Sequence, residues 1–365
     1  MQGAPSSMST TRVLVTGATG FIAGHGIEEL LKHGYDVRGT VRDLATADVE
    51  HLHAIARRSP SSLELVEATL DAEAGWAAAV DGVTYVWHMA SPNPPEVLRH
   101  EDELIRPAVD GTLRVLRAAA ASGTVRRVVM TSSLEAIARG YNRSDNRVRT
   151  ESDWSNPERS APYAKSKYYA ERAAWDFVGS QAAQLELVAI NPGLVLGPLL
   201  HAERTTSLEV IRLLLAGALP AVPRISFAVA DVRDVVRAHR LAMETPHAAG
   251  KRYIAAGEHL WMGDIAALLH AQFAARGYRI PTRAMPYWLL WTTARFDRTV
   301  RLALDFVGVP TNVSSARARR ELAWSTRPAA DSIQEAAESL VRFGVVPARG
   351  ADRGAKATQA VLSET

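Results

Sequence analysis

The 365-residue sequence contains no cysteine, which excludes disulfides, thiolate metal sites, iron–sulfur clusters and cysteine nucleophiles. It has no uninterrupted run of 18 apolar residues, so we expect no membrane span. Residues 1–11 carry no basic cluster, which argues against a signal peptide. Lysine is scarce, since 37 of the 42 basic residues are arginine, and 39 acidic residues nearly balance them. These absences favour a cytoplasmic globular protein with no nucleic-acid partner.

Strand-like and helix-like patterns alternate through the first half of the chain. Alternation at this spacing indicates right-handed βαβ units and a parallel sheet. The predicted fold is therefore α/β, a Rossmann-type doubly wound parallel sheet with a smaller, mostly helical C-terminal region. The expected strands are 12–16, 36–41, 63–67, 84–88, 127–131 and 186–190, and the expected helices are 21–33, 104–122 and 162–181.

After residue 198 this rhythm changes. Helical patterns at 207–216, 232–244 and 262–275 mix with short strands at 225–229 and 251–255, and some of these segments are expected to return to the main sheet. The stretch 286–307 is apolar and aromatic. We expect it to pack within the smaller region, while a substrate cover or a membrane contact stays open as an alternative. The tail 347–365 has no apolar periodicity, which predicts disorder.

A glycine-rich turn lies between the first expected strand and the first expected helix. Gly17 permits a tight turn, Gly20 lets the backbone approach a phosphate, and the small Ala23 lets the helix pack close to the strand. Phosphate groups bind the free N–H groups at a helix N-terminus. The predicted dinucleotide-binding residues of this turn are Gly17, Thr19, Gly20, Phe21 and Ile22.

The end of the second strand indicates which dinucleotide binds. NAD-binding folds usually carry a carboxylate there for the ribose 2′-hydroxyl, but this chain has Val41 followed by Arg42. A guanidinium can make paired charge-assisted bonds to a 2′-phosphate. We therefore predict NADP(H), with Arg42 as the phosphate ligand. Asp43 argues against this assignment of Arg42, because it could hold Arg42 in an ion pair.

Tyr163 and Lys167 are four residues apart in an expected helix, so they share one face. They follow, by about 30 residues, a strand that ends in Thr131, Ser132 and Ser133. Hydroxyls at the carboxyl end of a parallel strand face the ligand crevice. The spacing alone is only suggestive, and helix packing or turn chemistry are the alternative explanations.

With these motifs in place, the chain resembles an extended short-chain dehydrogenase/reductase. Within that superfamily it is similar to the group of dihydroflavonol reductases, cinnamoyl-CoA reductases and microbial aldehyde/ketone reductases. The resemblance covers nearly the whole chain, and the Ala-Ser-Pro element at 90–92 points to this branch in particular. The other matching segments are 16–23, 40–43, 86–89, 107–112, 131–133, 163–167, 191–198 and 231–235.

The resemblance implies a role for each residue. Ser133 would bind the substrate carbonyl oxygen, Tyr163 would give that oxygen its proton, and Lys167 would lower the tyrosine pKa and bond the nicotinamide ribose. The family pattern often has an aspartate where this chain has Thr69, which puts the adenine contacts in doubt. Ala23 and Ala108 are two further departures. The other implied cofactor contacts are Leu70, Ala90, Ser91, Pro192, Gly193 and Val195.

The resemblance implies an NADPH-dependent carbonyl reductase that acts on an aldehyde or ketone. A 3β-hydroxysteroid dehydrogenase-like enzyme, a nucleotide-sugar epimerase or dehydratase, and an NADP-sensing regulator without turnover are the alternatives. We expect no metal, because His51 and His53 point apart on a helix, and we leave a homodimer open. The expected parts are a flexible N-terminus (1–10), an NADP-binding Rossmann domain with the catalytic residues (11–198), a substrate-side region (199–346) and the tail (347–365).

Overall fold

The computed structural model describes residues 11–92, 99–142, 144–293, 295 and 304–349, which fall into two compact units. Unit 1 comprises the described residues of Met1–Ser132, Lys165–Ile190 and Val236–Arg252. Unit 2 comprises those of Ser133–Ala164, Asn191–Val235 and Tyr253–Thr365. The expected flexible N-terminus (1–10) and residues 350–365 of the expected tail lie outside the described residues. Within the described ranges, no helix is both long and apolar enough to cross a membrane.

One seven-stranded sheet, in the order β3-β2-β1-β4-β5-β6-β9, carries unit 1. The neighbouring pairs from β3 to β6 are all parallel. The strand order reverses beside β1, which is where doubly wound folds bind ligands outside the carboxyl ends of the strands. The predicted fold class is confirmed. The strands are β1 (Arg12–Val15), β2 (Asp36–Val41), β3 (Leu63–Glu67), β4 (Tyr85–His88), β5 (Arg127–Thr131), β6 (Glu186–Pro192) and β9 (Arg252–Ala255).

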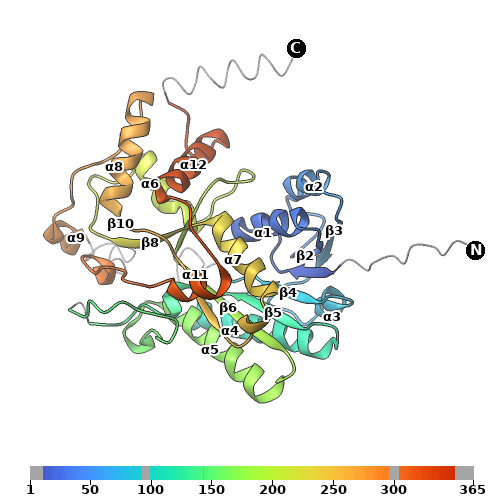
Figure 1. The fold of residues 1–365 in the computed structure, drawn as a ribbon. Coiled ribbons are helices and arrows are strands. Elements are labelled where there is room, and N and C mark those ends of the chain that lie inside the picture. The colour runs from blue at the N-terminus through green and yellow to red at the C-terminus, as the bar shows by residue number, and fades with distance from the viewer. Residues whose placement is uncertain (1–10, 93–98, 143, 294, 296–303, 350–365) are drawn as a thin grey trace, which may run out of the picture. The chain divides into compact units, whose positions relative to one another are not determined.

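Helices cover both faces of this sheet (Figure 1), so its central strands are apolar on both sides. On one face α3, α4 and α5 bury a single apolar cluster against the strands, with Trp76 and Phe177 among its large side chains. On the other face α1 and α7 are tied by an ion pair of 2.8 Å between Glu29 and Arg240. The helices are α1 (Phe21–Lys32), α2 (Glu50–Ala56), α3 (Trp76–Val80), α4 (Asp102–Ala121), α5 (Pro162–Gln181) and α7 (Val232–Glu244).

Two buried arginines connect strands of unit 1 to helix ends. Arg38 of β2 donates three hydrogen bonds of 2.8–3.1 Å to carbonyl groups at the end of α3, and it also binds Glu64. Arg127 of β5 likewise donates to three carbonyl groups at the end of α7 and binds Glu186. The last carbonyl groups of a helix have no partner within the helix and carry partial negative charge. The arginines therefore satisfy them without exposing the helix ends to water.

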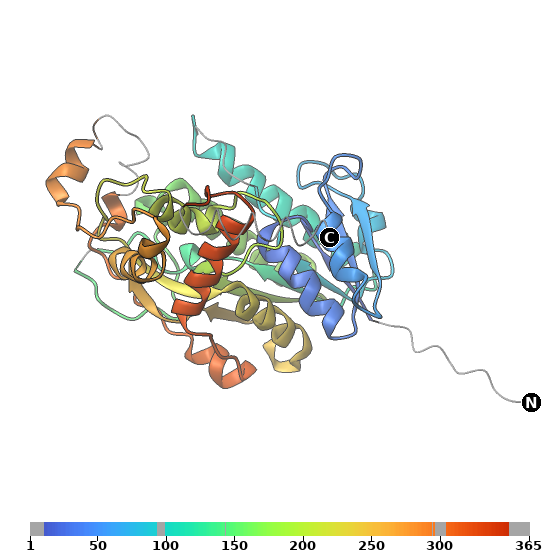
Figure 2. The same cartoon turned by 90° about the horizontal axis from the view of Figure 1, so that it is seen from above.

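Unit 2 is built on a smaller mixed sheet of order β10-β8-β7. Helix α12 contacts both α6 and α8, and it lies alongside α8 in Figures 1 and 2. Gly193 precedes β7 at a point of close approach, because a Cβ there would lie 1.9 Å from the carbonyl oxygen of Ala228. The elements are β7 (Leu194–Leu196), β8 (Ser226–Asp231), β10 (His259–Trp261), α6 (Glu209–Leu215), α8 (Met262–Phe273), α9 (Tyr287–Thr293), α11 (Ala316–Leu322) and α12 (Ala329–Arg342).

Six short 3-10 helices complete the elements that the described residues form. They are η1 (Leu134–Ala136), η2 (Pro157–Arg159), η3 (Thr206–Leu208), η4 (Pro246–Ala248), η5 (Ala274–Arg276) and η6 (Leu304–Phe306). The apolar stretch 286–307 contributes α9 and η6, while 294 and 296–303 lie outside the described residues. Within α9, Leu290 is buried but Trp288 is 67% exposed. The expectation that this stretch packs within the smaller region therefore agrees with the burial of Leu290 but not with the exposure of Trp288.

Candidate active site

The glycine turn after β1 is held by the end of β2. Gly17 has a positive φ of 68°, a backbone conformation that favours glycine. Its N–H donates to Thr40 Oγ1 at 3.0 Å, and the N–H of Ala18 donates to the Thr40 carbonyl oxygen at 2.8 Å. A Cβ on Gly17 would lie 3.1 Å from that of Ala90, so the turn also packs against the segment after β4. The turn is thus fixed between two neighbouring strands.

Helix α1 begins directly after this turn, with Gly20 as its N-cap. Among the described residues no side chain caps this helix start, and its first turn contains no acidic residue. The first N–H groups of a helix lack partners within the helix and carry partial positive charge. The backbone around Thr19, Gly20, Phe21 and Ile22 can therefore bind an anion such as a phosphate.

The end of β2 carries no carboxylate at the position where NAD-binding folds usually have one. Val41 is buried there, and Arg42 is exposed next to it. Asp43 accepts a hydrogen bond from the N–H of Ala45 at 2.8 Å, and Arg42 forms no ion pair with any described residue. The ion pair between Asp43 and Arg42 that the sequence allowed is therefore absent from the described residues.

Thr69 and Leu70 follow β3, and their backbone carbonyl oxygens accept hydrogen bonds from other side chains. The Trp76 indole N–H donates to the Thr69 carbonyl oxygen at 2.9 Å, and Arg114 donates to that of Leu70. A Cβ on Gly111 would lie 2.9 Å from Leu70 Cβ, so α4 lies close against this segment. The side chain of Leu70 therefore has a packing role, whatever it contributes to adenine binding.

His88 anchors the segment that carries Ala90 and Ser91. Thr16 Oγ1 accepts the N–H groups of Met89 and Ala90 at 3.0 and 2.9 Å and lies 3.1 Å from His88 Nδ1. Burial lowers the pKa of His88 to about 3, and the nearby Lys167 adds to this effect. A histidine that stays neutral at physiological pH is suited to holding this segment and is unsuited to proton transfer.

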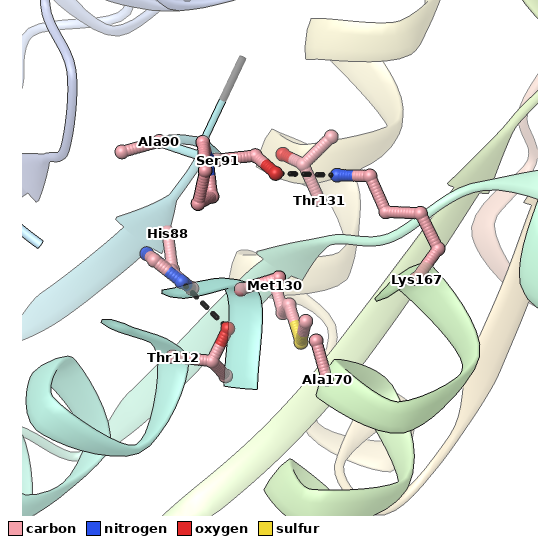
Figure 3. A pocket seen from close by; sticks show the side chains of 10 residues that line it. His88, Ala90, Ser91, Thr112, Met130, Thr131, Lys167 and Ala170 are labelled. Carbon is pink, nitrogen blue, oxygen red and sulfur yellow. Dashed lines mark hydrogen bonds between the residues drawn. The ribbon is translucent and has the colours of Figure 1, made fainter. Parts of the chain in front are cut away.

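A small pocket at the carboxyl ends of β4 and β5 contains Lys167 of α5 (Figure 3). Its ammonium group donates to Ser91 Oγ at 3.0 Å, and Thr131 lies beside this contact. Burial lowers the pKa of Lys167 to about 8, while the Glu171 carboxylate acts in the opposite direction. The hydrogen bond therefore joins Ser91, which was expected to contact the cofactor, to Lys167, which was expected to take part in catalysis.

One turn further along α5, the fully buried Glu171 connects three elements. It accepts hydrogen bonds from Ser132 Oγ at the end of β5 at 2.5 Å and from Arg252 Nε of β9 at 2.6 Å. The Trp175 indole N–H also donates to it at 3.2 Å. A buried carboxylate needs a cationic partner and further hydrogen bonds, and Glu171 has both. Glu171 thereby holds the end of β5, which directly precedes Ser133, against the part of α5 that carries Lys167.

In unit 2, the Ser133 hydroxyl accepts the N–H of Glu135 at 3.1 Å and is near enough to the Tyr163 hydroxyl to act on its pKa. Tyr163 is 43% exposed as a residue, while desolvation around its hydroxyl acts on its pKa. Burial raises the pKa of Tyr163 above its usual value, the Glu135 carboxylate raises it further, and the Ser133 hydroxyl opposes both. The lowering of this pKa by Lys167 stays a prediction.

The other residues expected near the nicotinamide also lie in unit 2. Asn191, at the end of β6, donates to the Ser133 carbonyl oxygen at 3.2 Å. Pro192 and Gly193 follow it directly, and Val195 is a buried residue of β7. These residues form a second backbone segment beside the Ser133 loop.

A family model described as the NAD dependent epimerase/dehydratase family matches residues 13–256. Cinnamoyl-CoA reductase 1 of Petunia hybrida is 38% identical over 76% of this chain and 81% of its own. The chain belongs to this family, the extended short-chain dehydrogenases/reductases. The resemblance stated from the sequence motifs is therefore confirmed, and the chain is an oxidoreductase.

Two solved structures of this family have the same fold as the chain. Gre2 from Candida albicans in complex with NADPH gives a TM-score of 0.75 at 28% identity, over 91% of this chain and 99% of that one. Yeast methylglyoxal/isovaleraldehyde reductase Gre2, also complexed with NADPH, gives 0.75 at 28%, over 92% and 99%. The match covers both units of this extended short-chain reductase.

Sequence analysis of this family member missed two polar contacts beside the candidate site. One is Glu171 with its partners, and its spacing of four residues from Lys167 could have indicated it. The other joins Thr131 Oγ1 to His239 Nε2 at 2.7 Å, and nothing in the sequence links two residues 108 positions apart.

Proposed function

We propose that the protein is an NADPH-dependent carbonyl reductase that converts an aldehyde or ketone to the alcohol. The observation that carries this proposal is the proximity of Ser133 and Tyr163 in unit 2, where the Ser133 hydroxyl lowers the pKa of Tyr163. Lys167 follows Tyr163 by one turn of α5, and residues at this spacing share a helix face. A serine, a tyrosine and a lysine in this arrangement provide a carbonyl-binding group, an acid and a cation.

Each of the three residues has a distinct task in the proposed reaction. Ser133 donates a hydrogen bond to the carbonyl oxygen of the substrate and orients it. Tyr163 transfers its hydroxyl proton to that oxygen as the alcohol forms. A tyrosine is protonated at neutral pH, and burial and Glu135 raise the pKa of Tyr163 further, so the hydroxyl carries its proton before the reaction. Lys167 supplies positive charge that favours the tyrosinate left after proton transfer.

The residues of unit 1 fit NADP(H). The uncapped start of α1 and the glycine turn are suited to a pyrophosphate, since a side chain at Gly17 would collide with Ala90. Val41 places no carboxylate against a 2′-phosphate, and the exposed Arg42 has no ion-pair partner among the described residues. Lys167 and Ser91 would hold the nicotinamide ribose side. When bound, NADPH supplies the hydride of the reduction, and two structural relatives were solved with it.

The proposed substrate class is an aldehyde or ketone. The relatives named above are reductases, one of cinnamoyl-CoA and one of methylglyoxal or isovaleraldehyde. Their common chemistry is reduction of a C=O group, and the Ser133–Tyr163 pair addresses that group alone. The rest of each substrate must be recognised by residues that differ between these proteins.

The test is NADPH consumption by the purified protein with a panel of aldehydes, ketones, ketoesters and steroids. We expect turnover with at least one aldehyde or ketone, and a preference for NADPH over NADH. Product analysis should give one alcohol per NADPH oxidised. Absence of turnover with every carbonyl, together with epimerisation or dehydration of a nucleotide sugar, would contradict the proposal.

A further inference from the structure

Glu135 forms an ion pair with Arg139 in unit 2, and its backbone is bonded to the Ser133 hydroxyl. Glu135 is the second residue after Ser133, and its N–H donates to Ser133 Oγ at 3.1 Å. This bond fixes the start of the 3-10 helix η1 relative to the Ser133 hydroxyl. The Glu135 carboxylate is close enough to Tyr163 for its charge to act on the tyrosine hydroxyl. Its position relative to the reacting groups is therefore set by the local backbone.

Arg139 holds the carboxylate of Glu135 in one orientation. Arg139 Nε and one of its terminal nitrogens lie 2.8 and 2.6 Å from the same carboxylate oxygen, Oε1. Ser155 links both backbones, since its hydroxyl accepts the N–H of Arg139 at 2.9 Å and donates to the Glu135 carbonyl oxygen at 2.8 Å. The guanidinium also lies 4.7 Å from the ring centroid of Phe306. The pair is therefore rigid.

The second carboxylate oxygen, Oε2, accepts no hydrogen bond from any residue that the structure describes. The Glu135 and Arg139 side chains are 17% and 19% exposed, so the pair is partly buried but accessible. A carboxylate oxygen in such surroundings can accept a strong hydrogen bond from a ligand. It also repels an anionic group and gains nothing from an alkyl group.

We propose that Glu135 is a specificity-determining residue that selects carbonyl substrates with a hydroxyl group beside the carbonyl. This inference rests on the proposed function. A carbonyl oxygen bound by Ser133 and Tyr163 places its neighbouring substituent within reach of groups around these hydroxyls. Glu135 Oε2 would be the acceptor there, because Arg139 binds the other carboxylate oxygen and leaves Oε2 open. The preferred class is α-hydroxy ketones and aldehydes, and α-keto acids are disfavoured.

The experiment compares kcat/KM for hydroxyacetone, for butan-2-one, which has the same number of heavy atoms, and for pyruvate. Because the hydroxyl also activates the carbonyl, the decisive quantity is how a variant changes the ratio of hydroxyacetone to butan-2-one. Glu135→Ala should lower this ratio about tenfold, the usual effect of losing a hydrogen bond to a charged group. The same variant should raise activity with pyruvate relative to butan-2-one, since the repulsion is gone.

Two further variants keep the test interpretable. Glu135→Gln preserves the shape and an acceptor oxygen but removes the charge, so its ratio should fall between those of the wild type and Glu135→Ala. Glu158→Ala removes an exposed glutamate of η2 in the same unit and should leave the ratio unchanged. Melting temperature and NADPH affinity of each variant check that the fold and the cofactor site are intact.

The outcomes separate the two proposals. Equal ratios in the wild type, Glu135→Ala and Glu135→Gln, with folded proteins and measurable turnover, would overturn the specificity role of Glu135. A wild type that prefers pyruvate to butan-2-one, with that preference lost in Arg139→Gln, would also overturn it, because Arg139 would then be the recognising group. Failure of the wild type to reduce any carbonyl would contradict the proposed function itself.

Discussion

The Lys167 ammonium group donates a 3.0 Å hydrogen bond to Ser91 Oγ, and this contact joins α5 to the segment after β4. Lys167 is 8% exposed, so the contact is shielded from water. The end of β4 is held in turn by Thr16 and His88. The lysine proposed for catalysis is thus positioned by the same segment that packs against the glycine turn.

Ser91→Ala should impair the enzyme without unfolding it. The variant removes the acceptor of Lys167 in a buried pocket, and a hydrogen bond to a charged group is typically worth about tenfold or more in a binding or rate constant. We expect kcat/KM for carbonyl reduction to fall by about tenfold. Ser180→Ala is the control. Ser180 lies on an exposed part of α5, the helix that carries Lys167, and its hydroxyl donates to the Asp176 carbonyl oxygen. Equal activity of the two variants would show that the contact is unimportant.

The rate of carbonyl reduction should fall as the pH rises through about 8. Burial lowers the pKa of Lys167 to about 8, so the amine is charged below this pH and neutral above it. Glu171 and its partner Arg252 face the same region of α5, and His88 is neutral throughout this range. Well above the pKa, kcat should drop about tenfold per pH unit if the charge is required.

The profile is measured between about pH 6 and 10 with NADPH and carbonyl substrate at saturation. Lys167→Met should be nearly inactive at every pH, and Lys32→Met, at the exposed end of α1, should follow the wild type. A wild-type rate that stays constant up to pH 10 would exclude a role for the charge of Lys167.

Replacing Glu171 should destabilise the protein. Glu171→Ala removes the carboxylate that the buried Arg252 binds and the acceptor of Ser132, and losing one partner of a buried ion pair costs about 3–5 kcal/mol. The melting temperature should fall by several degrees. Glu50→Ala breaks an exposed pair with Arg57 and should leave the melting temperature unchanged. An equal small effect of both substitutions would mean that water reaches Arg252.

Strands and helices with strong local patterns could be predicted from the sequence. The bounds of β2, β3, β5 and α5 agree with the predicted ones, because apolar or helical patterns mark these elements locally. The five-residue helix α3 could not be predicted. It is too short for a periodicity, and its stability comes from Arg38 at its C-terminal end and from the burial of Trp76.

The candidate site could be proposed from the sequence where family motifs carry it, but the contacts between distant residues could not. Ser133, Tyr163 and Lys167 follow from motif and spacing. The strand β7 depends on the close approach of Gly193 to Ala228, and Asp234 accepts hydrogen bonds from Arg327. These pairs lie 35 and 93 positions apart in the sequence, and no local pattern indicates them.

Arg42→Ala should weaken NADPH binding and leave NADH binding nearly unchanged. Arg42 is exposed beside the buried Val41, and a charge-assisted contact to the 2′-phosphate corresponds to roughly 10- to 150-fold in affinity. Val41→Asp should tilt preference toward NADH, since it adds repulsion of the phosphate and a partner for the ribose. Fluorescence titration with both cofactors measures this. Equal losses for NADPH and NADH would mean that Arg42 contacts a part common to both.

The most direct test of the proposed reaction is the single-turnover rate of Tyr163→Phe with bound NADPH and an accepted carbonyl substrate. The substitution removes one oxygen, which leaves packing intact and takes away the proton donor that Ser133 contacts. We expect unchanged NADPH affinity and a rate lower by about 10²- to 10⁴-fold, the usual contribution of a positioned acid. Tyr169→Phe, an exposed tyrosine of the same helix, should keep the wild-type rate. A Tyr163→Phe rate above half that of the wild type would contradict the account.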